Sequence, residues 1–329
     1  MNKNVLVFGG GTGMSCLLKG LKQFPVNITA VVSVCDDGGS TGILRDEFDM
    51  LAVGDIRKVL VALSQTEGSI EELLNHRFKT NGTLNKHTVG NVMLAAVTEM
   101  TGSVQHGIEL LSKILNLRGT VMPVTEDNVV LVGEMEDGSF VEGEHNITEA
   151  NKSIKRVFYK EVPVINENLI TKIHEADLIV FSMGSLYTSL LPCIACDKIK
   201  EALDNCNAPI LYACNLFTQP GETDEFTVSD HVEVINSYLG NKKVNMVVAN
   251  DGDIDKTLAH KYLTTEQKDS VILDKDKLDS MVDKVITDDL VIIEDDVFRH
   301  DYVTLGSIIF SEILRMNKNG KQKTHILKK

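Results

Sequence analysis

The sequence lacks any apolar run long enough to cross a membrane. No stretch reaches the roughly 18 apolar residues that a spanning helix needs. The polar start, Met1 to Asn4, leads directly into an apolar strand pattern and does not have the form of a signal peptide. We therefore expect a cytoplasmic protein with no membrane insertion.

Positive charge is also scarce. The chain has 33 Lys and Arg residues against 47 Asp and Glu, which gives a formal net charge of −14. Proteins that bind nucleic acids or membrane surfaces gain affinity from clustered Lys and Arg. We therefore expect no nucleic-acid partner, and any phosphate site must be local.

Cysteine is sparse and scattered. With six Cys in 329 residues, a protein of a reducing compartment needs no disulfide framework. Cys193 and Cys196 form a Cys-x-x-Cys pair, but no second pair or His cluster completes a zinc site. We interpret these thiols as buried or inert.

What the chain does contain is a recurring alternation of apolar strands and helical patterns. The run Val5 to Phe8 is followed by glycines, by leucines at helical spacing and then by the β-branched run Ile28 to Val34. Further apolar strands recur at 177–181, 209–213 and 244–249. This order predicts an α/β, Rossmann-like, doubly wound fold with a mostly parallel sheet.

Other segments depart from this alternation. Residues 55–116 read as amphipathic helices, which predicts a helical insertion, and residues 120–160 contain two strand patterns around an Asp137-Gly138 turn, which predicts a small antiparallel hairpin piece. A last helix is expected over 304–316. Residues 317–329 carry five lysines and are predicted to be a basic flexible tail. We therefore predict a single domain over residues 1–316.

The glycine turn Gly9 to Gly13 follows the first predicted strand. Such a turn can offer backbone N–H groups to an anion at a helix N-terminus, and the Thr12 hydroxyl can add to them. Met14 occupies the third glycine position of a dinucleotide fingerprint, and the Lys of a P-loop is missing. An NAD-dependent dehydrogenase is therefore disfavoured, while a strand–helix turn without a ligand remains the alternative.

Two carboxylates, Asp36 and Asp37, follow the second strand. Asp36 could accept a hydrogen bond from a ribose hydroxyl, or the pair could hold Mg²⁺ against a diphosphate, and a solvated turn is the alternative. We expect no other cofactor. Arg45 and Arg57 lie just beyond, where either guanidinium could clamp a phosphate or form a salt bridge.

Later loops carry further polar groups at predicted strand ends or helix starts. Asn91 belongs to a helix start, Gly184 to Ser189 form a second plausible anion nest, and Asn215 and Gln219 flank a Pro-Gly turn. No serine lies in a nucleophile elbow and no triad is evident, which disfavours a hydrolase. The triplet beginning at Arg299 suits a diphosphate or an internal ion-pair network.

Taken in order, these motifs resemble the YvcK family, the gluconeogenesis factors, over about residues 4–315. The motifs are Gly9-Gly10-Gly11-Thr12-Gly13, Asp36-Asp37-Gly38-Gly39-Ser40-Thr41-Gly42, Gly54-Asp55-Ile56-Arg57, Gly184-Ser185-Leu186-Tyr187-Thr188-Ser189, Thr218-Gln219-Pro220-Gly221-Glu222-Thr223 and Arg299-His300-Asp301. That family is related to CofD, the 2-phospho-lactate transferase, and shares its Rossmann-like fold. The resemblance implies a protein that binds UDP-sugars, notably UDP-N-acetylglucosamine, and is needed for cell shape and for growth on gluconeogenic carbon sources.

The resemblance also implies roles for individual residues. Gly10 to Gly13 would meet the diphosphate, Asp36 and Asp37 would match an acidic pair that serves metal and substrate, and Arg299 would hold the nucleotide sugar. Tyr262 could stack on uracil or belong to the core. The candidate ligand-binding residues are Gly10, Gly11, Thr12, Gly13, Asp36, Asp37, Gly39, Ser40, Thr41, Arg45, Arg57, Asn91, Gly184, Ser185, Asn215, Gln219, Tyr262 and Arg299.

Two hypotheses follow. The first is a regulator that senses a UDP-sugar, and it is favoured by several anion nests without a clear nucleophile. The second is a Mg²⁺-dependent transferase in which Asp36 and Asp37 would be catalytic. A homodimer and an unidentified protein partner remain open.

Overall fold

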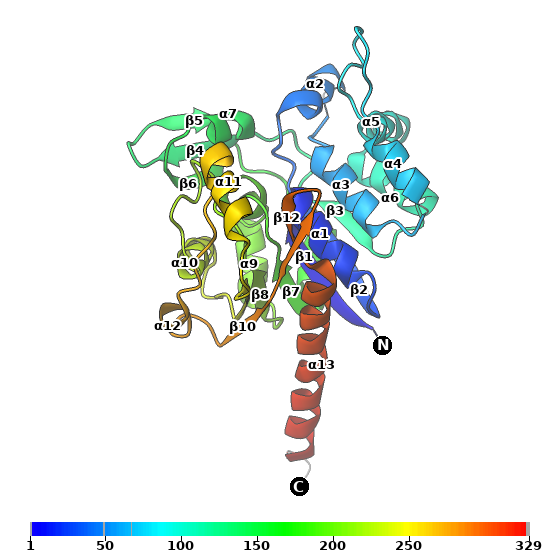
Figure 1. Cartoon of the computed structure of the whole chain (residues 1–329). Coiled ribbons are helices and arrows are strands. Elements are labelled where there is room, and N and C mark those ends of the chain that lie inside the picture. The colour runs from blue at the N-terminus through cyan, green and yellow to red at the C-terminus, as the bar shows by residue number, and fades with distance from the viewer. Residues whose placement is uncertain (1, 49, 67, 327–329) are drawn as a thin grey trace.

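The computed structural model describes residues 2–48, 50–66 and 68–326. One seven-stranded sheet has the order β10-β9-β8-β7-β1-β2-β3, and every neighbouring pair in it is parallel (Figure 1). The α/β fold predicted from the sequence is confirmed. Its strands are β1 (Lys3–Gly9), β2 (Val26–Val32), β3 (Thr120–Pro123), β7 (Leu178–Phe181), β8 (Ile210–Ala213), β9 (Met246–Asn250) and β10 (Lys284–Asp288).

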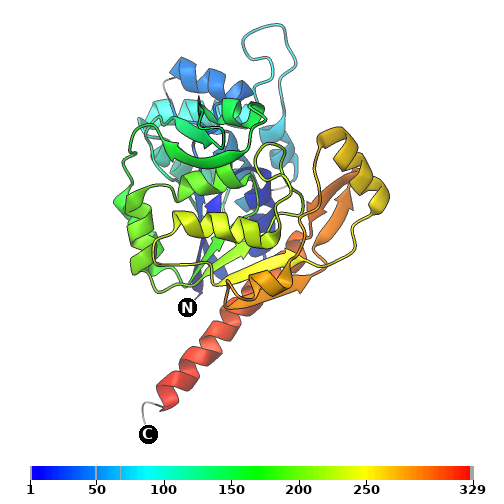
Figure 2. The same cartoon turned by 90° about the vertical axis from the view of Figure 1, so that its left-hand side faces the viewer.

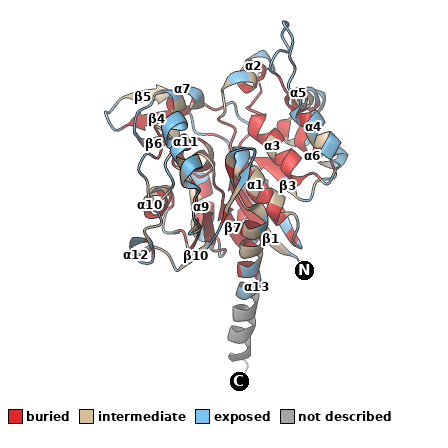
Figure 3. Cartoon of the chain, in the orientation of Figure 1, coloured by how far each residue is buried: buried red, intermediate tan, exposed pale blue. Residues whose placement is uncertain are grey.

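The order of the strands reverses at β1. From β1 the chain first builds outward through β2 and β3, and it later builds in the opposite direction from β7 to β10. Right-handed crossovers that run in opposite directions place their helices on opposite faces of the sheet. Strands at the reversal are therefore covered on both faces, and their side chains are apolar throughout. Val5 to Phe8 are accordingly almost fully buried, and Figure 3 shows the burial along the chain. Ligands of such sheets bind beyond the carboxyl ends at this reversal.

Helices follow the strands in the expected way. The helix α1 follows β1 and packs against α3 and α13, while α8 and α9 pack against each other. Among the described residues, no helix is both long and apolar enough to span a bilayer. The helices that alternate with the strands of the central sheet are α1 (Gly11–Leu21), α8 (Glu167–Glu175), α9 (Asp197–Asn205), α10 (Val228–Tyr238), α11 (Lys256–Glu266) and α12 (Lys275–Leu278), with the single turns η1 (Leu186–Leu190) and η2 (Leu191–Cys193) after β7.

The expected helical insertion lies between β2 and β3. Ser103 and Thr88 cap two of its helices by accepting hydrogen bonds from backbone N–H groups three residues on, which fixes where those helices begin. Its helices are α2 (Gly39–Phe48), α3 (Gly54–Leu63), α4 (Gly68–Asn75), α5 (Val89–Thr101) and α6 (Val104–Ile114).

The antiparallel piece forms a three-stranded sheet of order β5-β4-β6 together with a short helix. Its hairpin turns at Asp137-Gly138 as predicted, with Gly138 at φ +81°. The predicted limits of 120–160 were too wide, because residues 120–123 pair with β2 as an edge strand of the central sheet. The elements are β4 (Leu131–Met135), β5 (Phe140–Glu142), α7 (Glu144–Glu149) and β6 (Ile154–Tyr159).

The chain ends in the hairpin β11 (Val291–Glu294) and β12 (Val297–His300), followed by the helix α13 (Tyr302–Ile326). Figures 1 and 2 show α13 projecting from the body of the molecule. The helix is longer than the 304–316 we expected and continues through most of the predicted tail, while residues 327–329 lie outside the described part. Gly20 and Gly306 let α1 and α13 cross closely, since a Cβ at Gly20 would lie 1.9 Å from the carbonyl oxygen of Tyr302.

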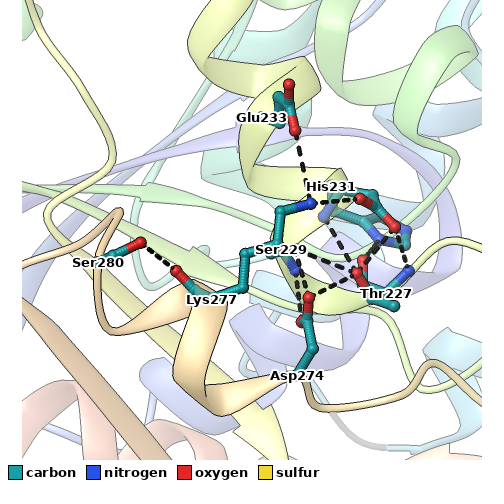
Figure 4. Close-up of polar contacts among 8 residues, drawn as sticks. Thr227, Ser229, His231, Glu233, Asp274, Lys277 and Ser280 are labelled. Carbon is teal, nitrogen blue, oxygen red and sulfur yellow. Dashed lines mark hydrogen bonds and ion pairs between the residues drawn. The ribbon is translucent and has the colours of Figure 1, made fainter.

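A carboxylate holds the start of α10 to a later segment of the chain (Figure 4). Asp274 accepts hydrogen bonds from the Ser229 backbone N–H at 3.0 Å and from the Thr227 hydroxyl at 2.9 Å. The Ser229 hydroxyl also donates to it. The N-terminus of α10 is thus satisfied from within the protein.

Candidate functional site

A cavity of about 960 Å³ opens at the carboxyl ends of the strands around β1. Its walls come from the loops after β1, β2, β7 and β8, and from α7, α11 and β12. Ligand pockets usually fall between roughly 300 and 1,000 Å³, so a ligand as large as a nucleotide sugar suits this volume.

The structure brings most, though not all, of the predicted residues to this cavity. Those that line it are Gly10, Gly11, Thr12, Gly13, Asp36, Gly184, Ser185, Asn215, Gln219, Tyr262 and Arg299. Those that do not are Asp37, Gly39, Ser40, Thr41, Arg45, Arg57 and Asn91.

The glycine turn forms one wall of the cavity. Gly11 has φ +65°, and a Cβ at Gly13 would lie 2.0 Å from the carbonyl oxygen of Met183, so these positions require glycine. Gly10 occupies the N-cap position of α1, where no side chain caps the helix, and the first turn of α1 has no acidic residues. The N-terminus of α1 is therefore open to an anion.

Three carboxylates, Asp36, Asp55 and Glu144, line the cavity beside this turn. Burial and the neighbouring charge of Asp55 raise the pKa of Asp36. Burial, with the charge of Asp36 added, raises the pKa of Glu144 to about 7. Asp55 forms an ion pair with Lys58 at 2.9 Å. On this side of the cavity, burial and mutual repulsion therefore disfavour the ionised form of these carboxyl groups.

Asp37 does not join this cluster. Its Oδ1 accepts the backbone N–H of His145 at 2.8 Å, at the start of α7, so the predicted pair of Asp36 and Asp37 does not converge on one point. Ser40 instead contacts the ring of His87 at 2.8 Å, and a Cβ at Gly54 would lie 2.6 Å from the hydroxyl of Thr41. Asp37 thus supports α7, and the first turn of α2, which contains Ser40 and Thr41, packs against the start of α3; neither lines the cavity.

The two arginines after this loop face away from the cavity. Arg57 donates to the side-chain oxygens of Asn91, at 3.1 Å, and of Asn75. These bonds join α3, α4 and α5 inside the helical unit, which is a structural role for Arg57 and Asn91. The Nε of Arg45 is buried and has no hydrogen-bond partner among the described residues.

The predicted second anion nest, Gly184 to Ser189, is already occupied by a carboxylate of the chain. Glu222, which is 4% exposed, accepts hydrogen bonds from the hydroxyl of Ser185 and from the backbone N–H of Tyr187. Gln219 also donates to Glu222 at 2.7 Å. An external phosphate would have to displace this buried carboxylate, so the second nest is not an anion site.

Arg299 stands on β12, whereas Glu144 of the acidic cluster stands on α7, so the two side chains come from different elements of the cavity wall. Arg299 forms no ion pair with any residue that the structure describes. The next two residues are used internally, because His300 contacts the Cys214 carbonyl at 3.1 Å and Asp301 caps α13 by accepting from Thr304. The triplet is therefore not an ion-pair network, and the charge of Arg299 remains available.

An aromatic group adjoins Arg299. Phe217 stacks on Phe298 with ring centroids 4.8 Å apart, and Tyr262 lies 5.2 Å from Phe217. The Tyr262 hydroxyl accepts the backbone N–H of Phe298 at 3.0 Å, which fixes the ring. Tyr262 is thus a buried member of this group and also part of the cavity wall.

Sequence reasoning missed several polar groups of the cavity, among them Asp55, Glu144, Ser33 and Thr148. A signal for Asp55 existed, since it belongs to the motif in which we chose Arg57. Residues two apart on a helix point in nearly opposite directions, so the two side chains could not serve the same site. Glu144 and Thr148 belong to the accessory piece, whose docking no local pattern indicated.

The chain is similar to several known proteins. The family described as 2-phospho-L-lactate transferase CofD matches residues 5–291. A protein named Gluconeogenesis factor from Halalkalibacterium halodurans is 46% identical over 301 residues, which cover 91% of this chain and 93% of the relative. Another of that name from Bacillus subtilis is 44% identical and covers 93% and 96%.

A crystal structure of a UPF0052 family member from Bacillus halodurans superposes with a TM-score of 0.90 at 45% identity, covering 94% of this chain and 99% of that one. Matches of this extent show that the chain belongs to the family and not only that it shares the fold. The chain belongs to the CofD family and, within it, groups with the gluconeogenesis factors that its motifs resemble.

Proposed function

We propose that this protein binds a UDP-sugar, UDP-N-acetylglucosamine in particular, and acts as a cytoplasmic regulator needed for normal cell shape and for growth on gluconeogenic carbon sources. The bound state would be read by a protein partner. The names of the relatives support the link to gluconeogenesis. The observation that carries the proposal is the pairing of an uncapped helix N-terminus with an available arginine in one large cavity.

The diphosphate is expected between the glycine turn and Arg299. The first N–H groups of α1 can donate to phosphate oxygens, and the helix dipole favours negative charge there. A guanidinium can hold two phosphate oxygens at once. The thiol of Cys16, on α1, donates to the carbonyl of His300 at 3.4 Å, so β12 contacts this helix at the residue after Arg299.

The nucleoside is expected on the aromatic side. Phe217 and Tyr262 offer apolar surface beside Arg299, and Asn215 and Gln219 present amides on the same wall. Aromatic faces bind nucleobases without demanding a full set of hydrogen bonds. Uracil would then lie against this wall, with the sugar directed toward the acidic cluster.

The acidic cluster favours a second candidate, a Mg²⁺-dependent transferase. Among the described residues, no group of three or more His, Cys, Asp or Glu is placed to hold a metal. Mg²⁺, however, often binds through one or two carboxylates together with substrate phosphates and water. Asp36 and Asp55 fit that role, because their mutual repulsion beside the glycine turn is what a divalent cation relieves. When bound, Mg²⁺ neutralises charge on a leaving phosphate.

Calorimetry with UDP-N-acetylglucosamine, with and without Mg²⁺, tests binding. Arg299→Ala should weaken binding by about ten- to hundredfold, since a charged hydrogen bond contributes roughly 1.5–3 kcal/mol. The control is Arg118→Ala, which removes an exposed arginine that donates a long hydrogen bond, of 3.5 Å, to the Phe24 carbonyl. Equal affinity of the two variants would contradict the proposal.

Phosphorus NMR of the same mixtures over several hours separates the two candidates. A regulator leaves the diphosphate signals unchanged. A loss of those signals that requires Mg²⁺ and is prevented by Asp55→Asn would establish the transferase in its place.

A further inference from the structure

Two buried hydroxyl groups of residues in the cavity wall have no hydrogen-bond partner among the residues that the structure describes. These are the Ser33 Oγ and the Thr148 Oγ1, and both residues line the cavity. Ser33 as a whole is 4% exposed. Leaving a buried hydroxyl unsatisfied costs roughly 1–3 kcal/mol, so these groups are suited to a ligand that supplies donors or acceptors.

The same part of the wall carries the carboxylates. Ser33 directly follows β2 and lies three residues before Asp36. Thr148 lies one helical turn after Glu144, on the same face of α7. A hydroxyl can donate or accept, whereas an ionised carboxylate only accepts. Together they form an acceptor-rich surface, which we call the acidic subsite: Ser33, Asp36, Asp55, Glu144 and Thr148.

The group suited to an anion belongs to a different element of the cavity wall, β12. Arg299 carries the available positive charge, while Lys58 is paired with Asp55 at 2.9 Å and Lys268 is paired with Glu266 at 2.7 Å. A second negative group on the ligand, placed in the acidic subsite, would meet carboxylates without a matching cation. Like charges at short range in a partly buried site are strongly unfavourable.

We propose that the acidic subsite selects the sugar of the ligand by charge, so that the protein binds nucleoside diphosphates linked to uncharged, hydroxyl-rich hexoses and rejects those linked to uronic acids. This inference rests on the proposed function, because it assumes that the nucleoside diphosphate occupies the glycine turn and Arg299. It adds that Ser33 and Thr148 bond to sugar hydroxyls.

UDP-glucose and UDP-glucuronate form a matched pair of probes, since they differ only in a hydroxymethyl group against a carboxylate at C6. Calorimetry with UDP, UDP-glucose and UDP-glucuronate, with and without Mg²⁺, measures the ratio of the two sugar-nucleotide affinities. UDP-glucose should bind at least about tenfold more tightly than UDP-glucuronate in both buffers.

Variants assign the effect to the subsite. Ser33→Ala and Thr148→Val should each weaken the binding of UDP-glucose by about fivefold, because each removes one hydrogen bond to the sugar. The affinity for UDP should change less. Ser69→Ala, which removes an exposed hydroxyl on α4, is the control. Glu144→Gln should narrow the gap between the two sugar nucleotides by improving UDP-glucuronate.

The outcomes separate the two proposals. Failure of UDP itself to bind would remove the proposed function, and this inference with it. Binding of UDP together with equal affinities for UDP-glucose and UDP-glucuronate would overturn this inference alone. So would variants of Ser33 and Thr148 that bind UDP-glucose as the control does.

Discussion

At the scale of single residues, the glycine turn is shaped by the side chain that faces it. A Cβ at Gly10 would lie 2.4 Å from Oδ2 of Asp55, a distance that real Cβ atoms do not adopt. Gly10→Ala should therefore push Asp55 aside, destabilise the fold by about 1–3 kcal/mol and abolish nucleotide binding. Urea unfolding and calorimetry measure the two effects.

The matched control for this change is Gly68→Ala, at the start of α4, where a Cβ would meet nothing within 4 Å. Its stability should stay within about 0.5 kcal/mol of the wild type. If both variants behave alike, the steric explanation for Gly10 is wrong.

Glu144 makes stability depend on pH. Burial and the charge of Asp36 raise its pKa from 4.5 to about 7, and Asp37 and Glu222 act in the same direction while Thr188 opposes them. The folded protein therefore holds the proton more tightly than the unfolded chain, so stability falls as pH rises from about 4.5 to about 7.

Glu144→Gln removes this penalty and should stabilise the protein by between about 1 and 3 kcal/mol near pH 8, with little difference near pH 5. Urea unfolding at the two pH values checks this. Exposed Glu149, on the same helix and also at the cavity, provides the comparison variant, Glu149→Gln. A stabilisation of Glu144→Gln that is larger near pH 5 would have the wrong sign.

At the scale of elements, the crossing of α1 and α13 connects the cavity to the end of the chain. Gly306 allows the close approach, because a Cβ there would lie 2.8 Å from the carbonyl carbon of Gly20. Gly306→Ala should force the helices apart and destabilise the protein by about 1–3 kcal/mol. Since α13 begins three residues after Arg299, nucleotide affinity should fall as well.

Thermal unfolding and calorimetry of Gly306→Ala test both parts of this prediction. Ser311→Ala, at an exposed position of the same helix, should leave stability and affinity unchanged. A destabilised Gly306→Ala that kept full affinity would separate the helix crossing from the position of Arg299.

The elements also show what sequence could and could not predict. Buried parallel strands such as Val5 to Phe8 are predictable because their apolar run is bounded by glycines. The edge strand β3 was not, because its four residues Thr120–Pro123 are too few to show a strand periodicity and are ordered by pairing with β2. Likewise the direction of Arg57, away from the cavity, depends on contacts with Asn75 and Asn91 that only the packed helices create.

At the scale of the whole molecule, ligand binding should raise thermal stability. A ligand at 100 times its Kd adds about 2.7 kcal/mol to the free energy of unfolding. With about 2.1 cal/mol/K of unfolding entropy per residue, this corresponds to a rise in Tm of roughly 4 °C for a chain of 329 residues. Differential scanning fluorimetry with UDP-N-acetylglucosamine measures this shift. N-acetylglucosamine alone should give none, and Arg299→Ala should reduce it; an undiminished shift would place the nucleotide elsewhere.

The carboxylate of Asp274 at the start of α10 has a consequence for stoichiometry. The helical segments after β7 and β8 donate backbone N–H groups to internal carboxylates, Glu222 and Asp274 respectively. Among the described residues, no carboxylate accepts a hydrogen bond from the first turn of α1, because Asp55, which faces Gly10, is paired with Lys58. The chain has thus filled two of these three positions with its own charge. We expect one nucleotide per chain, and calorimetric titration should reach its end point at an equimolar ratio.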